Sequence, residues 1–202
     1  MPANVAGLVF TGEKQMDTIR PPEEAVIDQC SATIDCCIDF RLQDQIGSFF
    51  QMERGEDFQA DRVTAAGGCL DLARGTEAEK AVRIKDLSVS VSKHRPEEVI
   101  LVIHTHCAAY ESLVRRCMVE QEIALDHMLE CERQIQVADA HVAADYLRSI
   151  FPFVTVRLYR ALVDPAKRRM VGLQRLSLMD NSPSMLASDF LRIEPFSALR
   201  MP

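Results

Sequence analysis

The residues best suited to metal chemistry stand at the end of an apolar run, in the stretch VIHTHC (102–107). It contains His104, His106 and Cys107, and imidazole nitrogen and thiolate sulfur are ligands that zinc prefers. Either histidine suits this chemistry, and the two would share a face if the strand ran on through both. The spacing favours His104, because residues three apart can wrap one turn around a metal. The adjacent His106 and Cys107 would have to fold back sharply.

A second polar set alternates along the stretch CIDFR (37–41), which also follows an apolar run. In an extended segment Cys37, Asp39 and Arg41 share one face, and the two apolar residues between them point into the opposite layer. A thiol, a carboxylate and a guanidinium would thus line the carboxyl end of a strand, where open α/β sheets place their ligands. A purely structural Asp–Arg pair at a strand end would leave the same pattern.

The rest of the chain alternates apolar runs with helical spacing, which is typical of an α/β fold. Unbroken Val, Ile and Leu residues within 97–106 predict a strand buried on both faces, in the middle of a parallel sheet. Thr76 and Glu79 open a helix as a capping-box pair, and a turn at Asp164-Pro165 predicts a closing hairpin. We therefore predict a mainly parallel central sheet with flanking helices and an edge hairpin. The predicted strands cover 32–40, 58–66, 97–106, 153–164 and 169–176, and the predicted helices cover 41–53, 76–94 and, with at least one break, 108–150.

The carboxyl ends of parallel strands lie at one edge of a sheet, so the two polar stretches can converge there. Cys37 from the first strand would then join Cys107 and one histidine from the third predicted strand. Three protein ligands with a fourth position open are the pattern of catalytic zinc sites, whereas structural sites use four. The sequence therefore predicts a zinc site at this edge.

Length and composition indicate a single soluble domain over 1–202, with an N-terminal arm (1–30) and a C-terminal tail (177–202) that packs on the domain or on a partner subunit. The net charge of -7 argues against nucleic acid as a partner, and a small molecule fits better. No apolar stretch is long enough to cross a membrane, and the N-terminus lacks the basic start of a secretion signal. Seven cysteines, an odd number, argue against a disulfide framework. We therefore expect a cytoplasmic protein with reduced thiols.

Three motifs in this order and spacing resemble the β-class carbonic anhydrases: CIDFR, AAGG (65–68) and HTHC (104–107). That family has a C-x-D-x-R strand end, a glycine turn after the second strand and H-x-x-C after the third. The resemblance covers about residues 30–175, including the late strand pair. It implies a β-carbonic anhydrase-like α/β fold. The site residues that it implies are zinc ligands at Cys37, His104 and Cys107 and an assisting pair at Asp39 and Arg41.

The resemblance also implies a zinc lyase that interconverts carbon dioxide and bicarbonate. Zinc lowers the pKa of a bound water toward about 7, so that a zinc-bound hydroxide can attack carbon dioxide at neutral pH. Asp39 would accept a hydrogen bond from that hydroxide while Arg41 keeps the carboxylate ionised and oriented. In some members of the family the aspartate instead closes the site by binding zinc, so both roles are open to Asp39. A homodimer or higher homo-oligomer is implied as well.

This chain departs from the family pattern beside the implied site. His106 replaces an aspartate and Ala108 a glycine, while Thr64 and Ala65 stand where arginine and asparagine are common. These changes leave the three implied ligands intact and alter their surroundings. Two other functions therefore remain open: a zinc hydrolase of carbonyl sulfide or carbon disulfide, and a non-catalytic zinc-binding protein of the same fold.

Overall fold

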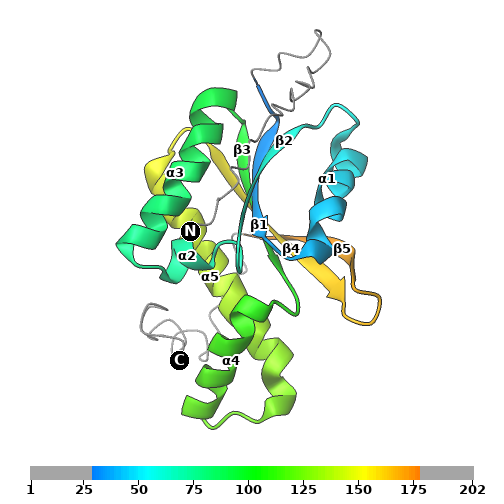
Figure 1. The fold of residues 1–202 in the computed structure, drawn as a ribbon, viewed down its shortest axis with the longest axis vertical. Helices are drawn as coiled ribbons and strands as arrows, with labels where there is room; N and C mark the ends of the chain where they lie inside the picture. Colours follow the sequence, from blue (N-terminus) through cyan, green and yellow to red (C-terminus); the bar gives the residue numbers. More distant parts are fainter. Residues whose placement is uncertain (1–28, 178–202) are drawn as a thin grey trace, which may run out of the picture.

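The computed structural model of the protein describes residues 29–177, which form a five-stranded sheet with helices on both faces (Figure 1). Most of the predicted arm (1–30) and nearly all of the predicted tail (177–202) lie outside the described residues. The strands are β1 (Ala32–Cys37), β2 (Ala60–Ala65), β3 (Glu98–His104), β4 (Thr155–Asp164) and β5 (Arg169–Leu176). The helices are α1 (Phe40–Arg54), α2 (Leu70–Arg74), α3 (Glu77–His94), α4 (Ala108–Glu120) and α5 (Met128–Ile150), with a short 3₁₀ turn at Leu125–His127.

The sheet has the strand order β2-β1-β3-β4-β5 and confirms the predicted mixture of parallel strands and an edge hairpin. β1 pairs in parallel with both β2 and β3, and β3 pairs in parallel with β4. β5 runs antiparallel to β4, as the turn at Asp164-Pro165 predicted. β1 and β3 are therefore adjacent and end at the same edge, which brings their terminal residues Cys37 and His104 together.

Both faces of the sheet are covered, so the apolar residues of β3 alternate between two cores. All seven residues of β3 are buried, as its unbroken Val/Ile/Leu composition predicted. Ile100 and Val102 pack into the core shared with α1 and α4, whereas Val99, Leu101 and Ile103 pack into the core shared with α2 and α3. Helix α5 is long enough to contribute to both cores, with its first half in one and its second half in the other.

The helices begin and end close to where local signals indicated. Thr76 and Glu79 form the reciprocal capping box that opens α3. The helical stretch 108–150 is broken after Glu120, which separates α4 from α5. Helix α2 is a short element that the sequence analysis did not predict. None of the helices in the described part of the chain is both long and apolar enough to cross a membrane.

The prediction of an extended CIDFR stretch was wrong in its second half. β1 ends at Cys37, and Asp39 caps the N-terminus of α1, with its carboxylate accepting the backbone N–H of Arg41 at 2.9 Å. Asp is a strong N-cap residue, and this local bond replaces the strand pairing that would have continued β1. Ile38 and Phe40 are consequently exposed rather than buried in the opposite layer, with exposed fractions of 58% and 65%.

A buried ion pair lies between the sheet and α3, on the face opposite α1. Asp35 is fully buried in the middle of β1, and Arg83 of α3 donates to its carboxylate. Removing one partner of a buried pair leaves the other charge uncompensated, which costs about 3–5 kcal/mol. We expect Asp35→Ala to lower the free energy of unfolding by roughly this amount in urea denaturation followed by circular dichroism.

The matched control for this prediction replaces both partners with apolar residues of similar size, Asp35→Leu with Arg83→Met. The double variant removes both buried charges, so it should recover most of the stability that Asp35→Ala loses. A loss below about 1 kcal/mol in Asp35→Ala would instead show that water reaches Arg83 and that the pair contributes little.

Candidate metal centre

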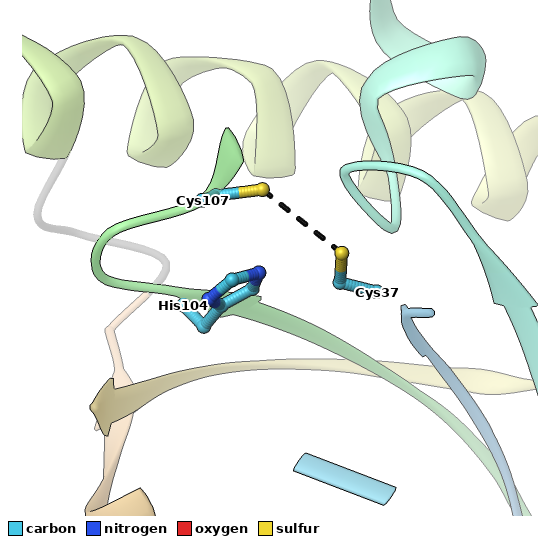
Figure 2. A group of neighbouring side chains, drawn as sticks. All are labelled: Cys37, His104 and Cys107. Atoms are coloured by element: carbon cyan, nitrogen blue, oxygen red, sulfur yellow. Dashed lines mark hydrogen bonds between the residues drawn. The ribbon is translucent and has the colours of Figure 1, made fainter. Parts of the chain in front are cut away.

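Cys37, His104 and Cys107 meet at the carboxyl edge of the sheet, although Cys37 is nearly 70 residues from the other two (Figure 2). Their ligand atoms all lie within 4.8 Å of one another, and all three residues are buried. The two sulfurs are 4.0 Å apart. Two sulfurs bound to one tetrahedral zinc ion at about 2.3 Å would be about 3.8 Å apart, so little movement would be needed to hold the metal. We call these three residues the cysteine–histidine group.

The ring of His104 is oriented so that one nitrogen remains available to a metal. Nδ1 lies 3.0 Å from the carbonyl oxygen of Thr105, which places the ring hydrogen on Nδ1 and the lone pair on Nε2. Nε2 is buried and has no hydrogen-bond partner among the described residues. A buried acceptor without a donor is costly, and a metal ion bound by Nε2 and the two sulfurs would satisfy it. The donor set therefore fits zinc.

The glycine turn after β2 packs closely against Cys37 and contacts its sulfur. The backbone N–H of Gly67 lies 3.3 Å from the Cys37 sulfur and donates to it. Gly67 and Gly68 both have positive φ, and a side chain on Gly68 would come within 3.2 Å of the Cys37 backbone nitrogen. The two glycines of this turn are thus needed for backbone shape, and the departures at Thr64 and Ala65 lie outside them.

The two thiols of the group have opposite pKa shifts. A hydrogen bond from the Cys107 thiol is the main cause that lowers the pKa of Cys37 to about 4, against the opposing effect of burial. The same hydrogen bond to Cys37, together with burial, raises the pKa of Cys107. At neutral pH the metal-free pair therefore carries one thiolate and one thiol.

Zinc binding is expected to release one proton from this cysteine pair near neutral pH. Zinc takes both sulfurs as thiolates, Cys37 is already ionised well above pH 4, and Cys107 must give up its proton. Zinc affinity should then rise about tenfold per pH unit between pH 7 and 8. Calorimetric titrations in buffers of different ionisation enthalpy count the released protons, and a count near two would mean that Cys37 is also protonated.

Asp39 and Arg41 form a tight ion pair, which we call the Asp–Arg dyad. The Arg41 Nε donates to both carboxylate oxygens of Asp39 at 2.9 and 3.0 Å, and Nη2 donates to one of them. The hydrogen bonds from Arg41 are the main cause that lowers the pKa of Asp39. Both carboxylate oxygens are thus engaged by Arg41, and Asp39 does not belong to the cysteine–histidine group.

The dyad is tied to the turn that carries two members of the group. Residues 104–107, here called the ligand turn, join β3 to α4. Nη2 of Arg41 donates to the carbonyl oxygen of His106 at 2.8 Å, and His106 has a left-handed backbone with φ of 57°. His106 therefore contributes through its backbone, which reverses the chain so that Cys107 faces back toward His104.

Two further residues that contact the ligand turn were missed by sequence reasoning. Glu132 and Gln136 of α5 are buried, and both hydrogen bond to the turn's backbone. Their only signal in the sequence is an i, i+4 pair of polar residues on the apolar face of a long helix. That signal does not indicate what they contact, because the turn lies 25 to 32 residues away along the chain.

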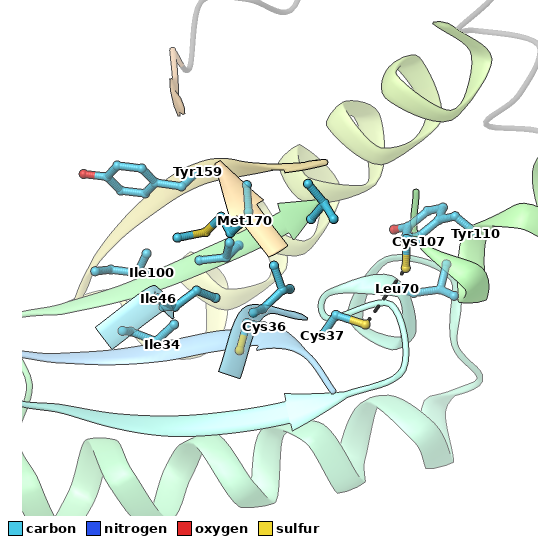
Figure 3. Close-up of a cluster of buried hydrophobic side chains, with 14 of the residues drawn as sticks. Ile34, Cys36, Cys37, Ile46, Leu70, Ile100, Cys107, Tyr110, Tyr159 and Met170 are labelled. Atoms are coloured by element: carbon cyan, nitrogen blue, oxygen red, sulfur yellow. Dashed lines mark hydrogen bonds between the residues drawn. The ribbon is translucent and has the colours of Figure 1, made fainter. Parts of the chain in front are cut away.

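One wall of the site is apolar. The sulfurs of Cys37 and Cys107 lie at the end of a buried cluster that includes Leu70 and Tyr110 (Figure 3). Tyr110 belongs to the first turn of α4 and is 1% exposed. Such a wall limits the access of water from that side and strengthens the electrostatic interactions of any bound ion.

The model of a protein family described as "Putative carbonic anhydrase" matches residues 27–150. No curated protein sequence matches the chain. Among solved structures, a carbonic anhydrase from Glaciozyma antarctica aligns with 17% identity over 73% of this chain and 83% of that one, with a TM-score of 0.42.

Two fungal β-carbonic anhydrases align over similar lengths. One of two tetrameric enzymes from Sordaria macrospora has 11% identity, a TM-score of 0.47 and coverage of 74% of this chain and 82% of that one. An enzyme from Aspergillus fumigatus has 12% identity, a TM-score of 0.46 and coverage of 81% and 82%. The family match spans more than half of the chain and includes the glycine turn and all three members of the cysteine–histidine group. The chain therefore belongs to the carbonic anhydrase family that this model describes.

Proposed function

We propose that the protein is a zinc-dependent lyase that interconverts carbon dioxide and bicarbonate. The observation that carries the proposal is the buried cysteine–histidine group beside an ionised carboxylate, in a chain of the carbonic anhydrase family. The sulfurs of Cys37 and Cys107 and the Nε2 of His104 would hold the metal. Bound zinc would supply the Lewis acidity that brings the ionisation of a water molecule to about neutral pH.

The Asp–Arg dyad would orient the reacting water and substrate. Arg41 holds Asp39 by its Nε and Nη2 and lowers its pKa, so the carboxylate stays ionised and accepts a hydrogen bond without taking a proton at neutral pH. Because Arg41 also holds the carbonyl of His106, the carboxylate is fixed relative to the ligand turn. This arrangement supports Asp39 as an assisting residue rather than as a fourth ligand that closes the site.

The residues that depart from the family pattern lie around the group rather than in it. Thr64 and Ala108 are exposed, Ala65 is half-buried at the end of β2, and His106 acts through its backbone. The carbonyl of Ala65 accepts the backbone N–H groups of Ile38 and Gly68, which any side chain at this position would allow. These positions therefore leave the cysteine–histidine group and the dyad unchanged.

Metal analysis combined with stopped-flow carbon dioxide hydration tests the proposal. We expect one zinc ion per chain and a hydration rate that disappears on chelation and returns with zinc. The same zinc-loaded protein should be assayed with carbonyl sulfide and carbon disulfide. Faster turnover of either would assign the site to a hydrolase, and stoichiometric zinc without any turnover would make the protein a non-catalytic zinc-binding module. Carefully purified protein without zinc or affinity for it would overturn all three functions.

A further inference from the structure

Two side chains of α5, Glu132 and Gln136, hydrogen bond to the backbone of the ligand turn. Gln136 donates from Nε2 to the carbonyl oxygen of His104 at 2.8 Å. Glu132 accepts the backbone N–H of Cys107 at 2.7 Å on Oε1 and that of His106 at 3.2 Å on Oε2. Gln136 also donates to Oε1 of Glu132 at 3.0 Å, so the two side chains form one connected unit.

The pattern of donors and acceptors matches what this turn requires. After β3 ends, the carbonyl of His104 needs a donor, and the N–H groups that precede α4 need an acceptor. Cys107 is the N-cap residue of α4, but its side chain makes no capping hydrogen bond. The Glu132 carboxylate, supplied from another helix, accepts the N–H groups of His106 and Cys107. The Cys107 sulfur makes no capping bond and faces Cys37 and His104.

The hydrogen bonds of Glu132 and Gln136 to the turn are buried, so losing one would disturb the shape of the turn. Glu132 is 3% exposed and Gln136 is fully buried, so no solvent is available to replace a lost hydrogen bond. The turn also contains the left-handed residue His106, whose conformation is sparsely populated for residues other than glycine. A strained turn persists only where its surroundings determine it. Glu132 accepts the N–H of His106 itself and the N–H of the next residue, Cys107.

We propose that Glu132 and Gln136 are positioning residues that hold His104 and Cys107 at the separation needed to bind one metal ion. The proposal rests on zinc binding by the cysteine–histidine group, which is part of the proposed function. Neither side chain reaches the metal in this role. They act through the backbone of the two ligands, as outer hydrogen-bond partners do in other metal sites.

The test compares Glu132→Gln with Glu130→Gln in the full chain. Glu132→Gln keeps the size of the side chain but replaces one acceptor oxygen with an amide donor that faces a backbone N–H. We expect zinc affinity, measured by competition with a chromophoric chelator, to fall about 10- to 100-fold. Glu130 lies on the same helix, is half exposed and pairs with Arg133 on the surface, so its variant should bind zinc like the wild type.

Cobalt substitution separates positioning from a purely structural role. The charge-transfer and ligand-field bands of Co²⁺ depend on the thiolate ligands and on their geometry, and we expect both sets of bands to change in Glu132→Gln. A structural role alone would lower the urea midpoint while the folded protein kept the wild-type spectrum and zinc affinity, and that result would overturn the proposal.

Gln136→Met is the second variant and decides the question if Glu132→Gln does not fold. It conserves volume and removes the donor to His104 while Glu132 keeps its backbone contacts. A weaker zinc affinity with an altered cobalt spectrum supports the proposal, and a wild-type spectrum with unchanged affinity overturns it. If the wild type itself binds neither metal, the proposed function fails before the role of Glu132 is in question, so the two failures are distinguishable.

Discussion

His104→Ala is expected to abolish stoichiometric zinc binding and, with it, any carbon dioxide hydration. The substitution removes the one ring nitrogen that is buried, unpartnered among the described residues and next to the two sulfurs. Losing a ligand should cost more zinc affinity than the roughly 10- to 100-fold typical of an outer contact. Metal analysis after dialysis and chelator competition measure the effect.

His106→Ala is the matched comparison, because it removes the neighbouring histidine from the same turn. Zinc binding should be retained, since His106 takes part through its N–H and carbonyl groups, which alanine also has. The left-handed φ of 57° adds a second control, because His106→Gly adopts that backbone without strain. If zinc were lost with His106 and kept without His104, the assignment of the ligands would be reversed.

Asp39→Asn is expected to keep the metal and to lower the hydration rate by about 10²- to 10⁴-fold, the range found for residues that manage a proton in the transition state. Asparagine is as good an N-cap as aspartate, so α1 should still begin at Phe40. The amide cannot form the two-oxygen ion pair with Arg41, and its NH₂ group donates where the carboxylate accepted. Stopped-flow hydration and metal analysis are measured on the same preparation.

Asp44→Asn controls for the loss of a negative charge on the same helix. Asp44 is exposed and lies one helical turn after the dyad, so its variant should hydrate carbon dioxide at the wild-type rate. Turnover that is unchanged in Asp39→Asn would remove the dyad from the mechanism. Loss of zinc in that variant would instead give Asp39 a role in holding the metal.

The order of elements could be predicted from the sequence because it depends on local patterns. The capping box at Thr76, the unbroken apolar run of β3 and the turn before β5 each describe a few neighbouring residues. The convergence of Cys37 with His104 followed from one further rule, that the ends of adjacent parallel strands share an edge. The structure confirms that β1 and β3 are parallel neighbours and that Cys37 and His104 lie close together.

The end of β1 could not be predicted from alternation alone. The pattern in CIDFR fits a strand, but Asp39 forms a local capping bond to the backbone of Arg41 and begins a helix there. The residues after Cys37 could continue the strand or begin a helix. Which conformation has the lower free energy depends on strand pairing, and that pairing ends at Cys37. The dyad survives this correction because the Arg41 side chain folds back onto Asp39.

The sequence by itself determined which residue types are available for a metal and at what spacing, because strand and turn periodicities are properties of neighbouring residues. Only the tertiary structure decided how the ligand turn is shaped. His106 has a left-handed backbone, and its turn is held by a donor from Arg41 and by hydrogen bonds from Glu132 and Gln136. These hydrogen bonds join segments far apart in the chain. Local sequence patterns do not indicate such contacts, because these hydrogen bonds form only when the packed sheet and α5 bring the groups together.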